Sequence, residues 1–93
     1  MAQYRKKPVV IEAWRASQLH WAAGNAWSDL PKQIVEAYER GHVLFLNHPA
    51  RIEIVTKEGR MTAAYSDLVI CGVQGELYPC KPDIFAATYE LVE

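Results

Sequence analysis

The chain has 93 residues, a formal net charge of −1 and a hydrophobic content of 51 %. This length allows one domain, residues 1–93, with a thin core. A charge so near zero removes the broad field on which most nucleic-acid-binding proteins rely, so an extended nucleic acid is not the expected partner. No apolar run approaches the ~18–20 residues that a membrane span needs, so we expect no membrane partner either.

The two cysteines form neither a Cys-x-x-Cys pair nor a dense framework, and this predicts a cytoplasmic protein. Three Trp, five Tyr and two Phe are more large side chains than a thin core hides easily. The surplus favours a subunit interface or a ligand pocket, so we expect a homo-oligomer.

The first predicted strand covers residues 4–14, where Pro8 suits the start of a strand or a sheet edge. Its entrance holds the only cluster of three like charges, Arg5, Lys6 and Lys7. Such a cluster is either a solvated strand entrance or a contact for phosphate.

Residues 16–27 have roughly helical spacing that Gly24-Asn25 interrupts, which predicts one turn of helix or an ordered loop. Trp21 and Trp27 both lie in this segment. Two indoles there either fill the core or line a pocket and stack on a planar ligand.

An amphipathic helix is predicted over about residues 29–40. Ser28 or Asp29 suits the N-cap, and Pro31 is tolerated in the first turn. Leu30, Ile34 and Tyr38 fall at i, i+4 and i+8, and Gly41 is the expected residue after the helix.

Strands and turns then follow at short intervals. The apolar run 42–47 is typical of a strand covered on both faces. Residues 51–56 and 60–65 alternate around a turn at 57–59, which predicts a hairpin with a polar outer face.

The last third predicts a strand at 68–73, a turn at Gln74-Gly75 and a short strand at 76–78 that Pro79 ends. A short helix over about 82–89 starts at Pro82, and residues 90–93 suit an edge strand. The expected fold is therefore α+β, with a five- or six-stranded mainly antiparallel sheet, one amphipathic helix and one short C-terminal helix.

Two blocks of the chain resemble a known family. YRKKPVVIEAW at residues 4–14 and GVQGELYPCKPDIFAATYELV at residues 72–92 are similar to the ends of a widespread family of small tailed-phage and prophage proteins. The resemblance implies a phage origin and a place in the host cytoplasm. It implies no reaction and no catalytic residue. Where the family usually has Gly-Asp, this chain has Ser66-Asp67.

Cys80 is the strongest candidate nucleophile. A following helix start and the neighbouring Lys81 both favour a thiolate, which is the reactive form of cysteine. A cysteine enzyme also needs a general base, and His20, His42 and His48 show no recognisable spacing to it. We therefore favour a structural Cys80 and assign no catalytic residue.

A Cys71–Cys80 disulfide depends on the hairpin register. With Gly75-Glu76 at the centre of the turn the two cysteines face each other, whereas with Gln74-Gly75 there Cys71 faces Tyr78. A reducing compartment and Pro79 both disfavour the bond. The spacing of Cys and His matches no metal site, and no cofactor is expected.

A binding site without chemistry is better supported. Lys81 and the start of the last helix form a modest anion site with which Asp83 competes, and aromatic residues, Phe85 among them, suit stacking on a base. The candidate ligand-binding residues are Arg5, Lys6, Lys7, Trp14, Trp21, Trp27, Tyr78 and Lys81.

The leading hypothesis is a small phage-encoded accessory protein that acts by binding and sequesters a host nucleotide-type signalling molecule to counter antiviral defence. The first alternative is a protein-binding inhibitor of a host enzyme, which an apolar patch around Trp21 and Trp27 would favour. The second alternative is an enzyme that uses Cys80.

Overall fold

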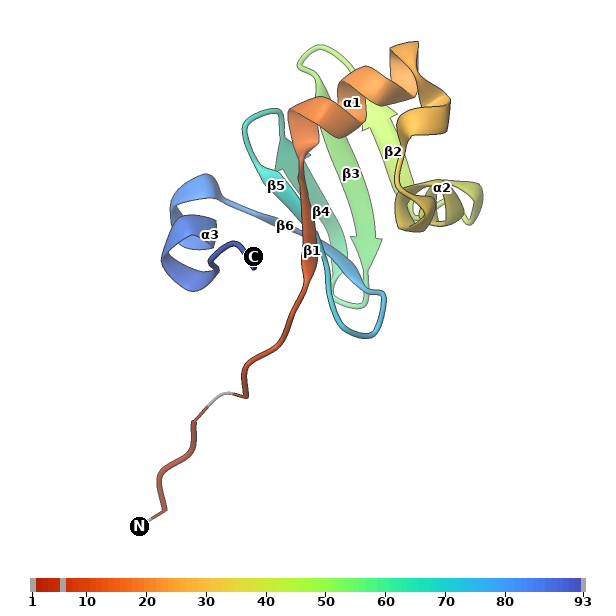
Figure 1. The fold of residues 1–93 in the computed structure, drawn as a ribbon. Coiled ribbons are helices and arrows are strands. Elements are labelled where there is room, and N and C mark those ends of the chain that lie inside the picture. The colour runs from red at the N-terminus through yellow and green to blue at the C-terminus, as the bar shows by residue number, and fades with distance from the viewer. Residues whose placement is uncertain (1, 6, 93) are drawn as a thin grey trace.

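The structure is a computed structural model that describes residues 2–5 and 7–92, and its fold is α+β (Figure 1). The elements, in chain order, are β1 (Glu12–Arg15), α1 (Ala16–Asn25), the 3-10 helix η1 (Trp27–Asp29), α2 (Lys32–Glu39), β2 (Val43–Leu46), β3 (Arg51–Thr56), β4 (Gly59–Ala64), β5 (Leu68–Cys71), β6 (Leu77–Cys80) and α3 (Pro82–Thr88). No helix among these is long and apolar enough to cross a membrane.

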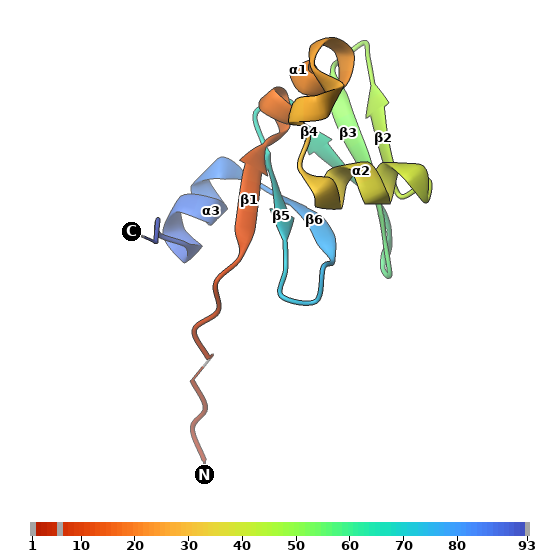
Figure 2. The ribbon, with the colours of Figure 1, turned by 45° about the vertical axis from the view of Figure 1, so that its right-hand side comes forward.

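The strands form two antiparallel sheets of three strands each, in the orders β1-β5-β6 and β2-β3-β4 (Figure 2). The prediction of a single five- or six-stranded sheet is therefore wrong in detail, because the strands are divided between two sheets. After β4 the chain turns, and β5 pairs with β1 and β6 and not with β4. The apolar side chains of both sheets still meet, because Val69 of the first sheet belongs to the same core as Ile52 and Ile54 of the second.

The β3–β4 hairpin confirms the alternation read from the sequence. Ile52, Ile54 and Ala63 are buried on one face, and Glu53 pairs with Arg60 at 3.1 Å on the other. The register opposes Thr56 to a glycine, so the turn itself is two residues long. By contrast, β2 was expected to be covered on both faces, and it lies at a sheet edge with only its first residue buried.

Helix α2 is the predicted amphipathic helix, although it is shorter than residues 29–40. Gly41 follows the end of α2, as predicted, and has a φ of 77°. The Gly41 N–H donates to the Tyr38 carbonyl at 2.9 Å and the His42 N–H to the Ala37 carbonyl at 2.8 Å, a Schellman arrangement. Its start was predicted wrongly, because Asp29 belongs to η1 and Pro31 is the residue before the helix.

Two predictions for the first third are wrong. The strand expected at 4–14 is paired only over β1, because β5 ends at Cys71, opposite Glu12. Residues 2–5 and 7–11, here called the N-terminal arm, have no regular structure and extend from the body (Figures 1 and 2). The segment expected to be a loop or one helical turn is α1, whose Ala16, Leu19 and Ala22 are buried at intervals of three.

The β5–β6 hairpin has neither of the two registers that we considered. Its loop is longer, closed by a bond from the Gly72 N–H to the Glu76 carbonyl at 2.8 Å, so that Cys71 faces Leu77. Pro79 was expected to end the pairing, yet it lies within β6 opposite Val69. Because Gly72 bonds to Glu76, every second residue of β6 directs its backbone groups toward β5, and Pro79 is not one of these residues. Its backbone nitrogen therefore points away from β5, where no N–H is needed.

Helix α3 confirms the predicted short helix, with a proline at its start and Asp83 in its first turn. Phe85 of α3 and Tyr89, the residue after the helix, have ring centroids 5.1 Å apart. Residues 90–92 form no strand, in contrast to the expected edge strand, and residue 93 lies outside the described residues.

Candidate binding surface

Helix α1 has one buried side and one side that faces solvent. Ala16, Leu19 and Ala22 are buried on the inner side, and Trp21 on the outer side has 57 % of its surface exposed. The Asn25 side-chain amide donates to the Trp21 carbonyl at 2.9 Å, which satisfies a carbonyl at the end of the helix. The two residues that suggested a break, Gly24 and Asn25, therefore end the helix and do not prevent it.

A chain of aromatic rings runs beside α1. Trp27 of η1 lies edge-on to Tyr38 of α2 at 4.9 Å, and both approach Phe45 of β2, at 6.2 and 6.0 Å. His20 of α1 joins Phe45, at 6.4 Å, to Tyr65 in the β4–β5 turn, at 6.2 Å. The His20 ring also donates to the Leu46 carbonyl at 2.8 Å.

Several of these large rings are exposed. Trp27, Tyr38 and Tyr65 have 40 %, 43 % and 49 % of their surfaces in solvent, beside the more exposed Trp21. We call these four residues the aromatic surface. Four exposed large aromatic side chains in one region are more than scattered surface hydrophobicity explains, and such patches mark interaction sites.

The aromatic surface surrounds a hollow of about 670 Å³ between α1, η1 and β2. Its lining is aromatic, aliphatic and amide: His20, Trp21, Ala23, Gly24, Asn25, Trp27, Tyr38, Leu44, Phe45, Leu46, Asn47, Ala50 and Tyr65. None of the described lining residues is Lys, Arg, Asp or Glu. We call it the aromatic hollow.

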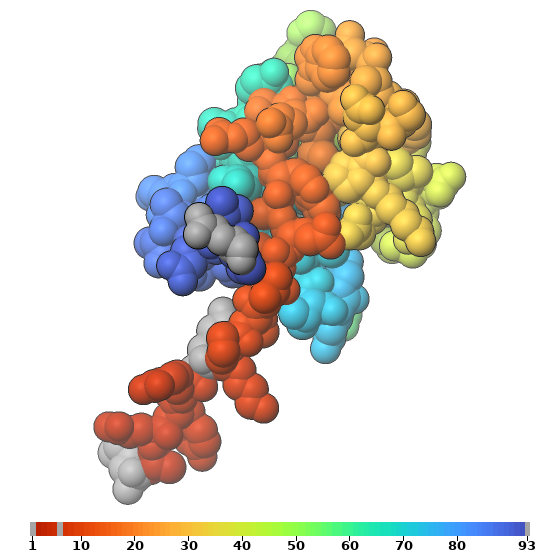
Figure 3. All heavy atoms as spheres, in the orientation of Figure 1, coloured from red at the N-terminus to blue at the C-terminus, as the bar shows by residue number. Residues whose placement is uncertain are grey.

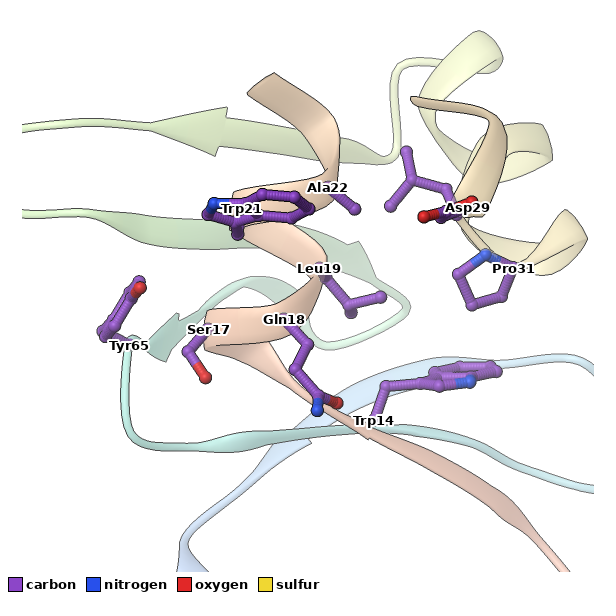
Figure 4. Close-up of a pocket in the computed structure, with 10 residues that line it drawn as sticks. Trp14, Ser17, Gln18, Leu19, Trp21, Ala22, Asp29, Pro31 and Tyr65 are labelled. Carbon is purple, nitrogen blue, oxygen red and sulfur yellow. The ribbon is translucent and has the colours of Figure 1, made fainter. Parts of the chain in front are cut away.

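A second depression, here called the indole groove, lies on the other side of Trp21 and has a volume of about 530 Å³. Trp14 and Trp21 line it, and Figure 4 shows their rings on either side of Leu19. Asp29 is the one charged residue among its described lining residues. Trp21 and Tyr65 line both depressions, so the two form one continuous surface.

The structure brings together part of the predicted site. Trp14, Trp21 and Trp27 gather around α1, as a pocket-lining role requires. Arg5 and Lys7 lie on the N-terminal arm, which points away from α1 (Figure 1). Lys6 falls outside the described residues.

Lys81 already has an anionic partner within the chain. Its ammonium lies 3.1 Å from the Oδ2 atom of Asp67, whose side chain is only 3 % exposed. The same oxygen accepts the Ala64 N–H at 2.9 Å, so Asp67 holds the β4–β5 turn and Lys81 together. An anion at Lys81 would compete with this carboxylate.

Tyr78 also faces a partner inside the fold. Its hydroxyl is 3.4 Å from the Tyr89 hydroxyl. Burial, the hydrogen bond to Tyr89 and nearby acidic groups raise the pKa of Tyr78 to about 12. The pair links β6 to the segment after α3, and Tyr78 stays protonated at neutral pH.

The environment of Cys80 does not favour a thiolate, although Lys81 and the following helix start suggested one. Burial, followed by the charges of Asp67 and Asp83, raises the pKa of the Cys80 thiol. The thiol donates to the carbonyl of Lys81 at 3.6 Å, and no histidine among the described residues forms a hydrogen bond with it. Burial also raises the pKa of Cys71, and the observed register leaves both cysteines as free thiols.

Sequence reasoning missed Tyr38, Phe45, Tyr65 and His20 as part of the surface. Tyr38 was placed on the apolar stripe of its helix, and periodicity does not tell how far from the core a stripe position lies. Among the described residues, no group of three His, Cys, Asp or Glu is placed to hold a metal ion.

Comparison of the chain with protein families, with curated proteins and with solved structures found no match.

Proposed function

We propose that this chain is a small phage-encoded accessory protein that acts by binding another protein through the aromatic surface, as an inhibitor of a host enzyme. The supporting observation is the set of four exposed aromatic rings around a hollow whose described lining has no charged side chain. Tryptophan and tyrosine dominate the binding energy of protein interfaces, because they bury much area for little loss of side-chain freedom. The phage origin comes from the resemblance of the two end blocks.

At the aromatic surface, the distribution of charge favours a protein over a nucleotide. A nucleotide-type ligand carries phosphates, which cationic side chains normally bind. The described lining of both depressions holds neither Lys nor Arg, and Asp29 adds a negative charge to the indole groove. Arg5 and Lys7 lie on the arm, and Lys81 is paired with Asp67.

A protein supplies what this surface can accept. An apolar anchor side chain fits the aromatic hollow, and a lysine or arginine beside it can lie over an indole face and near Asp29. We therefore expect the partner to present an apolar side chain flanked by a basic one.

The test starts with capture of host proteins on the immobilised chain and identification of the protein retained. Titration calorimetry with the purified partner then compares the wild type with Trp21→Ala and Trp27→Ala. Each substitution removes an exposed ring at the hollow, and we expect the Kd to rise at least ~30-fold, an effect of ~2 kcal/mol typical of a central aromatic residue. Tyr4→Ala is the matched control, because Tyr4 is an exposed aromatic residue on the arm. Equal binding by all four proteins would refute the proposal.

The indole groove supports a second candidate, the sequestration of a host nucleotide-type signalling molecule used in antiviral defence. Two tryptophans line a groove whose volume of about 530 Å³ falls within the ~300–1,000 Å³ of small-molecule sites. Stacking of a base on Trp14 or Trp21 is the interaction that such a groove offers.

Calorimetric titration of the chain with nucleotides and cyclic nucleotides tests this candidate. We expect any heat of binding to disappear in Trp21→Ala and to remain in Trp27→Ala, because Trp27 does not line the described part of the groove. Absence of heat with every nucleotide in the wild type would exclude the small-molecule function and leave the protein-binding one untouched.

A further inference from the structure

The N-terminal arm exposes apolar side chains along an extended backbone. Tyr4, Val9 and Val10 are exposed, and Val10 has 71 % of its surface in solvent. The space-filling view shows the arm projecting beyond the rest of the chain (Figure 3). Neither a turn nor a bend interrupts the described residues of the arm. An extended, partly apolar segment of this kind is the form in which a strand adds to the edge of a sheet.

The hydrogen bonds of β1 show which backbone groups point to its free edge. Ala16 continues the register of β1 with β5, and its N–H donates to the Asp67 carbonyl at 2.9 Å. Because backbone groups alternate in direction along an antiparallel strand, Glu12 and Trp14 face β5, while Ala13 and Arg15 face away from it.

The Gly72–Glu76 bond supports the same alternation from the other side of β5. It turns Gly72 and Ile70 toward β6, and therefore turns Cys71, the partner of Glu12, toward β1. Since β1 is an edge strand, the outward groups of Ala13 and Arg15 have no partner strand among the described residues. A strand that extends β1 into the arm would turn the backbone groups of Val9 and Ile11 to the same free edge.

We propose that two copies of the chain pair through this edge, with β1 and the arm of one copy antiparallel to β1 and the arm of the other. The first sheets of the two copies would then join into one sheet of six strands. In a two-fold antiparallel contact, the outward N–H and C=O groups of one copy lie opposite the outward groups of the other. The two edges can therefore form hydrogen bonds with each other. This inference is independent of the aromatic surface.

The position of the proline fits this contact. Pro8 is an even number of residues from Glu12 and Trp14, so in an extended strand its backbone nitrogen points to the same side as theirs. That side faces away from the second copy, where the missing N–H of proline is not needed. The ladder between the two copies therefore loses no hydrogen bond at Pro8. The contact also covers exposed side chains of the arm, in agreement with the homo-oligomer that the composition led us to expect.

The test is sedimentation analysis of the full chain from about 1 µM to 1 mM, for the wild type and two proline variants. Ile11→Pro removes an outward N–H from each copy, and we expect the Kd of the dimer to rise about ten-fold, the effect of two lost hydrogen bonds. Val10→Pro is the matched control: its N–H points to the side of β5, beyond the last paired residue, Cys71. The Kd of that dimer should change less than three-fold.

Hydrogen exchange of the wild type provides a second readout that does not depend on the folding of a variant. In the dimer, the amides of Val9 and Ile11 should be protected and that of Val10 should exchange freely, and dilution should remove the difference. A monomer at every concentration, or a dimer without this alternation, would overturn the proposal. Protection of the arm only after addition of a foreign protein would assign the edge to that protein and overturn it as well.

Discussion

Replacing Lys81 by methionine tests whether this lysine is a structural residue or a free binding residue. Lys81→Met keeps a long flexible side chain and removes the ammonium that lies 3.1 Å from Asp67. The carboxylate of Asp67 remains almost fully buried and keeps the bond from the Ala64 N–H at 2.9 Å. The variant therefore leaves a buried charge with fewer partners.

The expected cost follows from the burial of the two partners. A hydrogen bond to a charged group contributes about 1.5–3 kcal/mol to stability. The Lys81 side chain is 62 % exposed, so water screens part of the interaction and replaces part of it. We expect a loss of about 1–2 kcal/mol, which lowers the Tm of a domain of this size by roughly 4–16 °C.

Thermal and urea unfolding followed by tryptophan fluorescence measure this loss. Lys57→Met is the matched control, because Lys57 is an exposed lysine in the two-residue β3–β4 turn. Asp67→Ala should cost more, about 3 kcal/mol, because it also removes the acceptor of the Ala64 N–H. If Lys81→Met were no less stable than Lys57→Met, the pair with Asp67 would have no structural weight and the reasoning would be wrong.

The raised pKa of Tyr78, about 12, predicts that the contribution of this residue to stability is constant below pH 10 and falls as the pH rises from 10 to 12, because the unfolded chain loses this proton first. Tyr78→Phe should weaken that dependence, and Tm measured against pH for both proteins checks it. The raised pKa values of Cys71 and Cys80 predict that both thiols react with iodoacetamide at pH 7.5 more slowly in the folded protein than in urea. Rapid labelling of folded Cys80 would revive its role as a nucleophile.

Local pattern was enough to predict several elements. The hairpin of β3 and β4 follows from alternation with a period of two around a polar turn. The end of α2 follows from Gly41, whose φ of 77° few other residues adopt, and the start of α3 follows from its proline. In each case, the signal and the structure that it specifies lie within a few residues.

The candidate site was predicted only in part. The tryptophans of residues 16–27 were recognised as core or pocket residues, and the structure places Trp21 and Trp27 at one hollow. Their neighbours Tyr38 and Phe45 come from α2 and β2, and nothing in sequence spacing brings those two rings within 6.0 Å. The basic cluster was grouped with the aromatics because both suit a nucleotide, yet the arm carries Arg5 and Lys7 away from them.

The sequence by itself determined where α2 ends, where α3 starts and which residues of the β3–β4 hairpin are buried, because glycine, proline and periodicity act over a few bonds. Only the tertiary structure decided that α1 is a helix, since a helix of 10 residues is marginal in isolation and the burial of Ala16, Leu19 and Ala22 stabilises it. Pairing of β1 with β5, more than 50 residues later in the chain, divided the expected sheet in two. The same long-range packing left Trp21 exposed and gathered the rings around it, because contacts between distant segments depend on which apolar faces meet.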